Sequence, residues 1–119
     1  MTITGIDHVQ VAAPAGCEAQ ARAFYGHLLG LEELPKPEEL AARGGCWFRA
    51  GAQELHVGVD DAFVPARRAH PGLVVSDLDE LAGRLGDAGF AVTHDDSIPG
   101  TRRIHVEDPF GNRLEFRQG

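Results

Sequence analysis

The chain has 119 residues, 43% of them hydrophobic and 24% charged, with a formal net charge of −7. This length suits one compact domain or two very small ones, and the hydrophobic content is typical of a folded protein rather than a disordered one. The negative charge argues against a nucleic-acid-binding protein, which normally presents a basic face. Local arginine clusters could still bind a small anion.

The two cysteines, Cys17 and Cys46, have no C-x-x-C spacing. This usage is typical of reduced thiols in a cytosolic protein, with a structural disulfide as the alternative. The first residues lack the basic and apolar regions of a signal peptide, and no apolar run approaches the roughly 20 residues needed to span a bilayer. We therefore expect a soluble cytoplasmic protein without a membrane or nucleic-acid partner.

The first half of the chain predicts a strand, a helix and three further strands. Alternating and helical patterns place these elements at residues 3–12, 18–29, 31–34, 46–50 and 53–59. His8 lies on the more polar face of the first strand, and His56 shares a face of the last strand with Glu54. Tyr25 lies on the apolar stripe of the helix, which indicates a core residue.

The second half repeats this order after a linker at about residues 60–69. Strands are predicted at 70–75 and 90–93, a helix capped by Ser76 or Asp77 extends to about residue 88, and a hairpin ends the chain. In the hairpin, the turn residues 108–112 precede a strand in which Glu115 lies opposite Leu114 and Phe116. Glu115 is therefore either a solvated surface charge or part of a site.

The spacing of the two halves indicates an internal duplication. Gly30 and Gly89, each at the end of a predicted helix, are 59 positions apart (89 − 30). His56 and Glu115 are also 59 apart (115 − 56), and His8 and His70 are 62 apart (70 − 8). A unit of about 60 residues buries only about 60% of its unfolded surface. We therefore expect two modules, 1–61 and 69–119, that pack together within one chain or between two.

Four polar residues occupy equivalent strand positions in the two modules, opposite the larger apolar residues: His8, His56, His70 and Glu115. Nitrogen and oxygen donors without cysteine suit a divalent metal such as Zn, Ni, Fe, Co or Mn. A lone histidine on a strand is more often a surface or hydrogen-bonded residue than a ligand. The repeat favours the metal-ligand interpretation.

Further polar residues share the predicted faces of these ligands. Trp47, Arg49, Arg103 and His105 are candidates for substrate binding in a pocket of aromatic and cationic character. The alternative is that these side chains are solvated at a sheet edge. For the two arginines, the sequence favours neither interpretation over the other.

Four segments resemble the vicinal oxygen chelate superfamily, which includes glyoxalase I, bleomycin-resistance proteins, extradiol dioxygenases and fosfomycin-resistance thiol transferases. The segments are IDHVQV, FYGHLLGLEEL, AHPGLVVSDLDELAGRLGDAGF and EDPFGNRLEF. The resemblance implies an α+β fold of two βαβββ modules, whose half-open, curved mixed sheets surround a cup that holds a metal. It implies His8, His70 and Glu115 as metal ligands. Where glyoxalase-like members often have Glu, this chain has His56, a departure that weakens a strict glyoxalase I assignment.

The resemblance implies a metal-dependent enzyme, in which the metal chelates two vicinal substrate oxygens and stabilises an enolate or oxyanion. Glyoxalase-like lyase or isomerase chemistry is the first expectation, with thiol transfer or dioxygenation behind it. His56, as fourth ligand or proton shuttle, and Glu115 are the expected catalytic residues. The alternatives are a non-catalytic, bleomycin-resistance-like protein that sequesters a small ligand, and a dimer whose former site no longer works. Superfamily members of this length are commonly homodimers.

Overall fold

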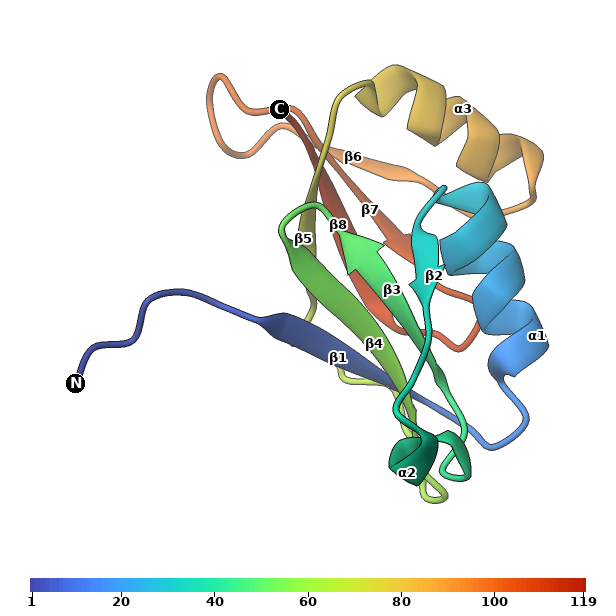
Figure 1. Ribbon diagram of the computed structural model, residues 1–119. Coiled ribbons are helices and arrows are strands. Elements are labelled where there is room, and N and C mark those ends of the chain that lie inside the picture. The colour runs from blue at the N-terminus through green and yellow to red at the C-terminus, as the bar shows by residue number, and fades with distance from the viewer. The chain divides into compact units, whose positions relative to one another are not determined.

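The computed structural model describes residues 1–119 and divides into two compact units, Met1–Val64 and Pro65–Gly119. Each unit contains one open four-stranded mixed sheet and has the order strand, helix and three strands (Figure 1). The predicted α+β fold of two βαβββ modules is therefore confirmed. No helix combines the length and the apolar character needed to cross a membrane.

In the first unit the strands lie in the order β1-β4-β3-β2. The first and last strands pair in parallel, and the other neighbours are antiparallel. The elements are β1 (His8–Ala13), α1 (Glu18–Ala21), the π-helical segment η1 (Arg22–Leu28), β2 (Glu32–Leu34), α2 (Glu38–Ala41), β3 (Cys46–Ala50) and β4 (Gln53–Val59).

The core of the first unit forms where the helical stripe meets one face of this sheet. Phe24 and Tyr25 are almost completely buried and their rings meet edge to face at 5.0 Å. Tyr25 also contacts Phe48 of β3, with ring centroids 5.8 Å apart. Buried aromatic rings contribute much of the stability of a small domain because each removes a large apolar area from water. Tyr25 is thus a core residue, as its position on the helical stripe predicts.

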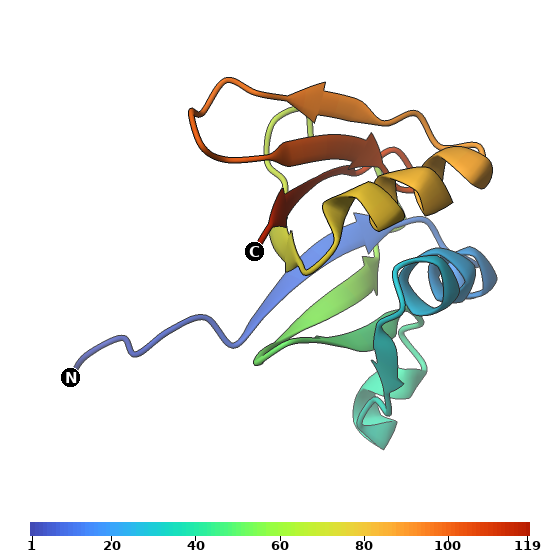
Figure 2. The same ribbon diagram turned by 90° about the horizontal axis from the view of Figure 1, so that it is seen from above.

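The second unit repeats the topology, with the strand order β5-β8-β7-β6 and a parallel pairing of β5 with β8. Helix α3 contacts β7 and β8 of the same sheet (Figure 2). The elements are β5 (Gly72–Val75), α3 (Leu78–Asp87), β6 (Thr93–Asp95), β7 (Arg103–Glu107) and β8 (Arg113–Gln118). The side chains of Ile104, Leu114 and Phe116 are buried on one face, so the alternate residues lie on the other.

Three predicted strand boundaries were wrong. The first strand begins at His8 rather than at residue 3, because β4 begins at Gln53 and its register with β1 starts at the pair of His8 with Glu54. Residues 1–7 instead form an extended arm that projects from β1 (Figure 2). In the second unit β5 begins at Gly72, so His70 lies just before the strand.

The strand predicted at residues 90–93 is β6 at Thr93–Asp95. Gly89 has a φ of +91°, and the N–H groups of Gly89 and Phe90 donate to the carbonyls of Gly86 and Leu85. This pattern is a Schellman motif, in which the residue after the glycine still satisfies a helix carbonyl. Phe90 therefore completes the end of α3 and is not free to start a strand.

Candidate functional site

The turn between β7 and β8 determines which residues face Glu115. The Asp108 carboxylate accepts hydrogen bonds from the N–H groups of Phe110 at 2.9 Å and Asn112 at 2.8 Å, and Gly111 has a φ of +92°. A side chain that accepts hydrogen bonds from the backbone of its own turn stabilises that turn, and glycine adopts a positive φ without strain. The resulting register places His105 directly opposite Glu115 on the open face of the sheet.

Glu115 bridges two basic groups. One of its carboxylate oxygens lies 3.2 Å from His70 Nε2, and the other lies 3.2 Å from Arg103 Nη1. Burial favours the protonated form, but the hydrogen bonds from Arg103 and His70 outweigh it and lower the pKa of Glu115. Glu115 is therefore a carboxylate at neutral pH, as a metal ligand or a general base must be.

The surroundings of His70 determine which of its ring nitrogens can bind a metal. Its Nδ1 lies 2.7 Å from the carbonyl oxygen of Arg68, which can only accept a hydrogen bond. Nδ1 therefore carries a proton, and in the neutral ring the lone pair belongs to Nε2. Nε2 faces Glu115 Oε1 at 3.2 Å, so either a second proton or a cation lies between these two atoms. The pair fits a metal site, in which ligating histidines commonly donate their other nitrogen to a carbonyl.

Asp95 binds the two residues of β7 that were predicted to contact substrate. Its Oδ2 lies 2.9 Å from Arg103 Nη2 and 3.1 Å from His105 Nε2. Hydrogen bonds from the side chain and backbone of Ser97, and then from His105, hold the pKa of Asp95 far below its ordinary value. Arg103 is thus shared between two carboxylates. Arg103 Nε and His105 Nδ1 are buried without a hydrogen-bond partner.

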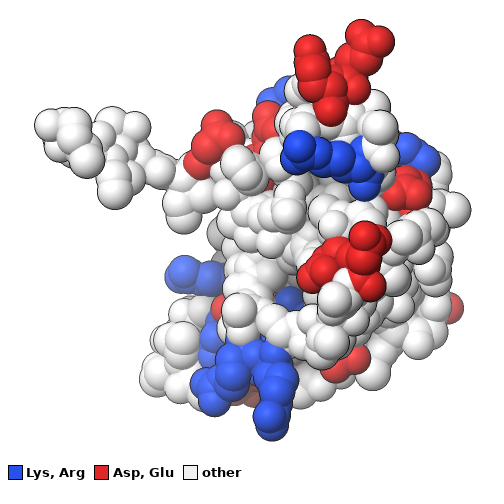
Figure 3. Space-filling model, turned by 90° about the horizontal axis from the view of Figure 1, so that it is seen from below, with Lys and Arg blue, Asp and Glu red and all other residues white.

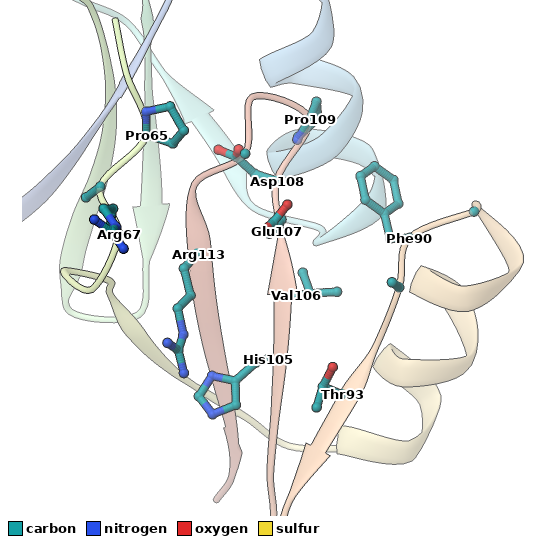
Figure 4. Close-up of a pocket in the computed structure, with 14 residues that line it drawn as sticks. Pro65, Arg67, Phe90, Thr93, His105, Val106, Glu107, Asp108, Pro109 and Arg113 are labelled. Atoms are coloured by element: carbon teal, nitrogen blue, oxygen red, sulfur yellow. The ribbon is translucent and has the colours of Figure 1, made fainter.

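A surface pocket of about 950 Å³ lies beside this network in the second unit (Figure 4). His105 and Arg113 line it, and Figure 4 shows the Arg113 side chain directed along β8 toward the His105 ring. His70 and Glu115 do not line the pocket. The pocket therefore reaches the predicted substrate residue His105 but not the predicted metal ligands.

The first unit brings its two predicted ligands together in a stack of rings. The His56 ring lies between His8, with centroids 4.3 Å apart, and Trp47, with centroids 4.2 Å apart and an interplanar angle of 3°. Cross-strand pairing produces the second contact, since Trp47 lies opposite His56 in the register of β3 and β4. His56 is only 5% exposed. Arg49, by contrast, is exposed, with its Nε 3.6 Å from Glu32.

The two histidines of this stack donate through different nitrogens. His8 Nδ1 lies 2.9 Å from a carboxylate oxygen of Asp7, so Nδ1 carries the proton and Nε2 keeps its lone pair. In His56 it is Nε2 that lies 2.9 Å from a carboxylate, that of Glu54. Neither Glu54 nor Asp95 was among the residues predicted to form the site. Glu54 could have been found there, because it shares the strand face of His56.

The predicted ligands therefore form two pairs, His8 with His56 in the first unit and His70 with Glu115 in the second. No group of three or more His, Cys, Asp or Glu side chains in the structure is arranged to hold a metal ion. Cys17 and Cys46 are buried free thiols, in agreement with the expected reduced state. Burial, together with the neighbouring Glu18 carboxylate, raises the pKa of Cys17 to about 11, which makes it a poor nucleophile.

Charge is divided into local groups on the face drawn in Figure 3. Lys and Arg side chains gather in separate clusters with Asp and Glu between them, and no continuous basic surface covers this face (Figure 3). The electrostatics of a bound small molecule would therefore depend on nearby residues rather than on the net charge of −7.

Comparison with known proteins identifies the fold and the family. Residues 5–116 match the model of the Glyoxalase/Bleomycin resistance protein/Dioxygenase superfamily. A glyoxalase family protein from Bacillus anthracis is 55% identical, with a TM-score of 0.95 over 100% of this chain and 98% of that one. No curated protein matches the chain.

Two more distant solved structures share the fold. Lactoylglutathione lyase from Agrobacterium tumefaciens is 21% identical, with a TM-score of 0.77 over 100% of this chain and 96% of that one. The fosfomycin resistance protein FosX from Listeria monocytogenes is 16% identical, with a TM-score of 0.77 over 99% of this chain and 95% of that one. With the βαβββ topology in both units and the family match along almost the whole sequence, the chain belongs to the Glyoxalase/Bleomycin resistance protein/Dioxygenase superfamily.

Proposed function

We propose that the protein is a metal-dependent enzyme that acts on a small substrate with two vicinal oxygens. The observation that carries this proposal is the matched hydrogen bonding of two equivalent histidines. His8 and His70 each place Nδ1 within 2.9 Å of an oxygen, an arrangement that leaves Nε2 to face a cation once it carries no proton. A hydrogen bond at one nitrogen that orients the other is the usual arrangement of a metal-ligating histidine.

The proposed ligands are His8, His70 and Glu115, with a fourth donor from β4. On that strand His56 and Glu54 are both candidates, because their side chains lie within 2.9 Å of each other. Two imidazoles and carboxylate oxygens without thiolate suit Zn, Ni, Fe, Co or Mn.

A bound divalent cation would supply Lewis-acid polarisation of two adjacent substrate oxygens. The chain itself must then move a proton between neighbouring substrate atoms. Glu115 can accept a proton because Arg103 and His70 keep it ionised at neutral pH. His56 is the second proposed proton carrier. Lyase or isomerase chemistry of the glyoxalase type is the preferred reaction, and thiol transfer and dioxygenation are the alternatives.

Elemental analysis of protein purified without added metal tests this proposal. We expect a bound divalent metal in the wild type and a large loss of it in His70→Ala and Glu115→Ala. His27→Ala is the matched control, because His27 is an exposed histidine outside both pairs. A wild type that neither contains a metal nor binds one on titration would overturn the proposal. A metal-free protein that still bound a small aromatic ligand would support sequestration instead.

We also propose that the protein is a cytoplasmic homodimer. Large apolar side chains lie exposed on the N-terminal arm and on β5, including Ile3 at 84%, Ile6 at 67% and Val74 at 71%. Such residues are candidates for burial against a second copy. Sedimentation equilibrium should give twice the chain mass of 12.8 kDa. A mass of one chain at micromolar concentration would contradict the dimer.

A further inference from the structure

We infer that the surface pocket of the second unit is a binding site for a small organic carboxylate, held by Arg67 and Arg113. Neither arginine was among the residues predicted to form the site. All residues that line this pocket of about 950 Å³ belong to the unit Pro65–Gly119, so one unit builds it alone. The inference goes beyond the proposed metal chemistry and does not depend on it.

The first argument is that both arginines lack a partner within the chain. Arg102 and Arg103 of the same unit each pair with a carboxylate. The guanidinium groups of Arg67 and Arg113 make neither an ion pair nor a hydrogen bond. A guanidinium presents its N–H donors in a rigid fork that matches the two oxygens of a carboxylate. The pocket therefore offers an anion donors that the protein itself leaves unused.

The second argument is the direction of the Arg113 side chain. Glu107 lies directly opposite Arg113 in the register of β7 and β8, where side chains of opposite charge commonly pair. No such ion pair forms, and the Arg113 side chain instead extends along β8 toward the His105 ring (Figure 4). Its charge is therefore left for a ligand in the pocket rather than for the carboxylate across the strand.

The third argument concerns the negative charge that lines the pocket. Asp108 is buried, and its carboxylate accepts hydrogen bonds from the N–H groups of its own turn, whose dipoles offset its charge. The remaining charges are those of Arg67, Arg113 and the exposed Glu107. This balance favours an anion of single charge. A carboxylate fits it better than a phosphate monoester, which carries between about 1.5 and 2 negative charges at neutral pH.

The apolar residues of the lining indicate what the carboxylate is attached to. Pro65, Phe90 and Pro109 also line the pocket. Figure 4 shows their rings near the β7–β8 turn, with Arg113 and His105 farther along the strands. Small-molecule sites commonly combine apolar walls with a few placed polar groups. The ligand class is therefore a carboxylate with an aromatic or similarly compact apolar body.

Benzoate binding to protein kept free of metal by a chelator tests this assignment. Isothermal titration calorimetry should show saturable binding to the wild type and none of benzyl alcohol, which has the same ring without the charge. Arg113→Gln should weaken benzoate binding by at least about tenfold, because a hydrogen bond to a charged group is lost. Arg67→Gln should weaken it less, since Arg67 is exposed.

Two further variants make the test specific. Arg117→Gln is the matched control, because Arg117 is an exposed arginine of β8 outside the pocket, and this variant should bind benzoate like the wild type. Glu107→Gln should bind benzoate more tightly, because it removes the opposing carboxylate. Absence of saturable benzoate binding, equal affinities in Arg113→Gln and Arg117→Gln, or tighter binding of phenyl phosphate than of benzoate would overturn the inference.

Nuclear magnetic resonance locates the bound benzoate and needs no variant to fold. The amide signals of Phe90, Thr93 and Gly111, which line the pocket, should shift as benzoate is added to the wild type. Shifts confined to residues of the first unit would overturn the inference. Because no metal is present, these outcomes are independent of whether the proposed metal-dependent function is correct.

Discussion

Histidines at similar strand positions differ here in their hydrogen bonds. His8, His56 and His70 all lie on or beside strands, yet only the first and last carry a hydrogen on Nδ1 that is donated to an oxygen. The alternation around Leu114 and Phe116 predicts correctly that Glu115 faces away from the core. The proton positions could not be predicted, because they depend on acceptors such as the Arg68 carbonyl, whose location follows from the fold.

Asp95 should make the stability of the protein depend on pH. Its pKa is strongly lowered in the folded state by Ser97 and then His105, so the stabilisation is fully present above its ordinary pKa of 3.8 and is lost as the pH falls toward the folded value. Urea unfolding at pH 7 and pH 3 should therefore show a smaller loss of stability for Asp95→Asn than for the wild type. Asp96→Asn, a change of the neighbouring exposed carboxylate, should leave the loss unchanged.

Phe116 should be among the most costly core residues to truncate. It is 1% exposed in the second unit, and a Phe→Ala change in a core typically costs about 3–5 kcal/mol. Val64→Ala is the control, because Val64 is 78% exposed, lies outside the N-terminal arm and β5, and should lose less than about 0.5 kcal/mol. Urea denaturation of the two variants measures both. Equal losses would contradict the assignment of Phe116 to the core.

Local chemistry determines where most of the elements begin and end. The strands at residues 46–50 and 53–59 were predicted with the right bounds, because alternation and a Gly51 turn both lie in the sequence. The start of β1 was not predicted correctly, because it depends on the partner strand β4, in which the partner of His8 is Glu54, 46 positions later (54 − 8). The position of β6 was wrong because Phe90 completes the Schellman motif of α3.

Asp77 should stabilise the start of α3. Its side chain accepts the Glu80 N–H at 3.0 Å, which satisfies one of the otherwise unpaired donors of the first helical turn. Asp77→Ala should lower the free energy of unfolding by about 0.5–2 kcal/mol. Asp77→Asn should retain most of the stability because asparagine is an equally good cap. Circular dichroism with urea titration distinguishes the two, and similar losses would argue against capping.

The whole molecule consists of two copies of one topology whose equivalent positions have diverged. The last strand of each unit carries His56 in one case and Glu115 in the other, and the sequence repeat was sufficient to predict that these positions correspond. It could not show that Glu54, two residues earlier, accepts a hydrogen bond from His56, because that contact depends on side-chain conformation. Superfamily membership covers residues 5–116, so both copies belong to it.

Metal binding should stabilise the protein as a whole if the proposed ligands are correct. A ligand present at 100 times its dissociation constant stabilises the folded state by about 2.7 kcal/mol. Differential scanning fluorimetry should therefore show a higher melting temperature with zinc and a return to the metal-free value with chelator. Glu115→Gln should lose most of the shift, whereas His27→Ala should keep it.

The parallel pairing of the first and last strands in each unit has a consequence for folding kinetics. The paired residues His8 and Glu54 are 46 positions apart, and Gly72 and Glu115 are 43 apart (115 − 72). Hairpins such as β7–β8 can form early, but contacts so distant in sequence form late and slowly. The proposed metal ligands of each unit therefore meet late in folding. If they bind a metal as proposed, metal uptake by a refolding chain should follow the formation of these parallel pairs.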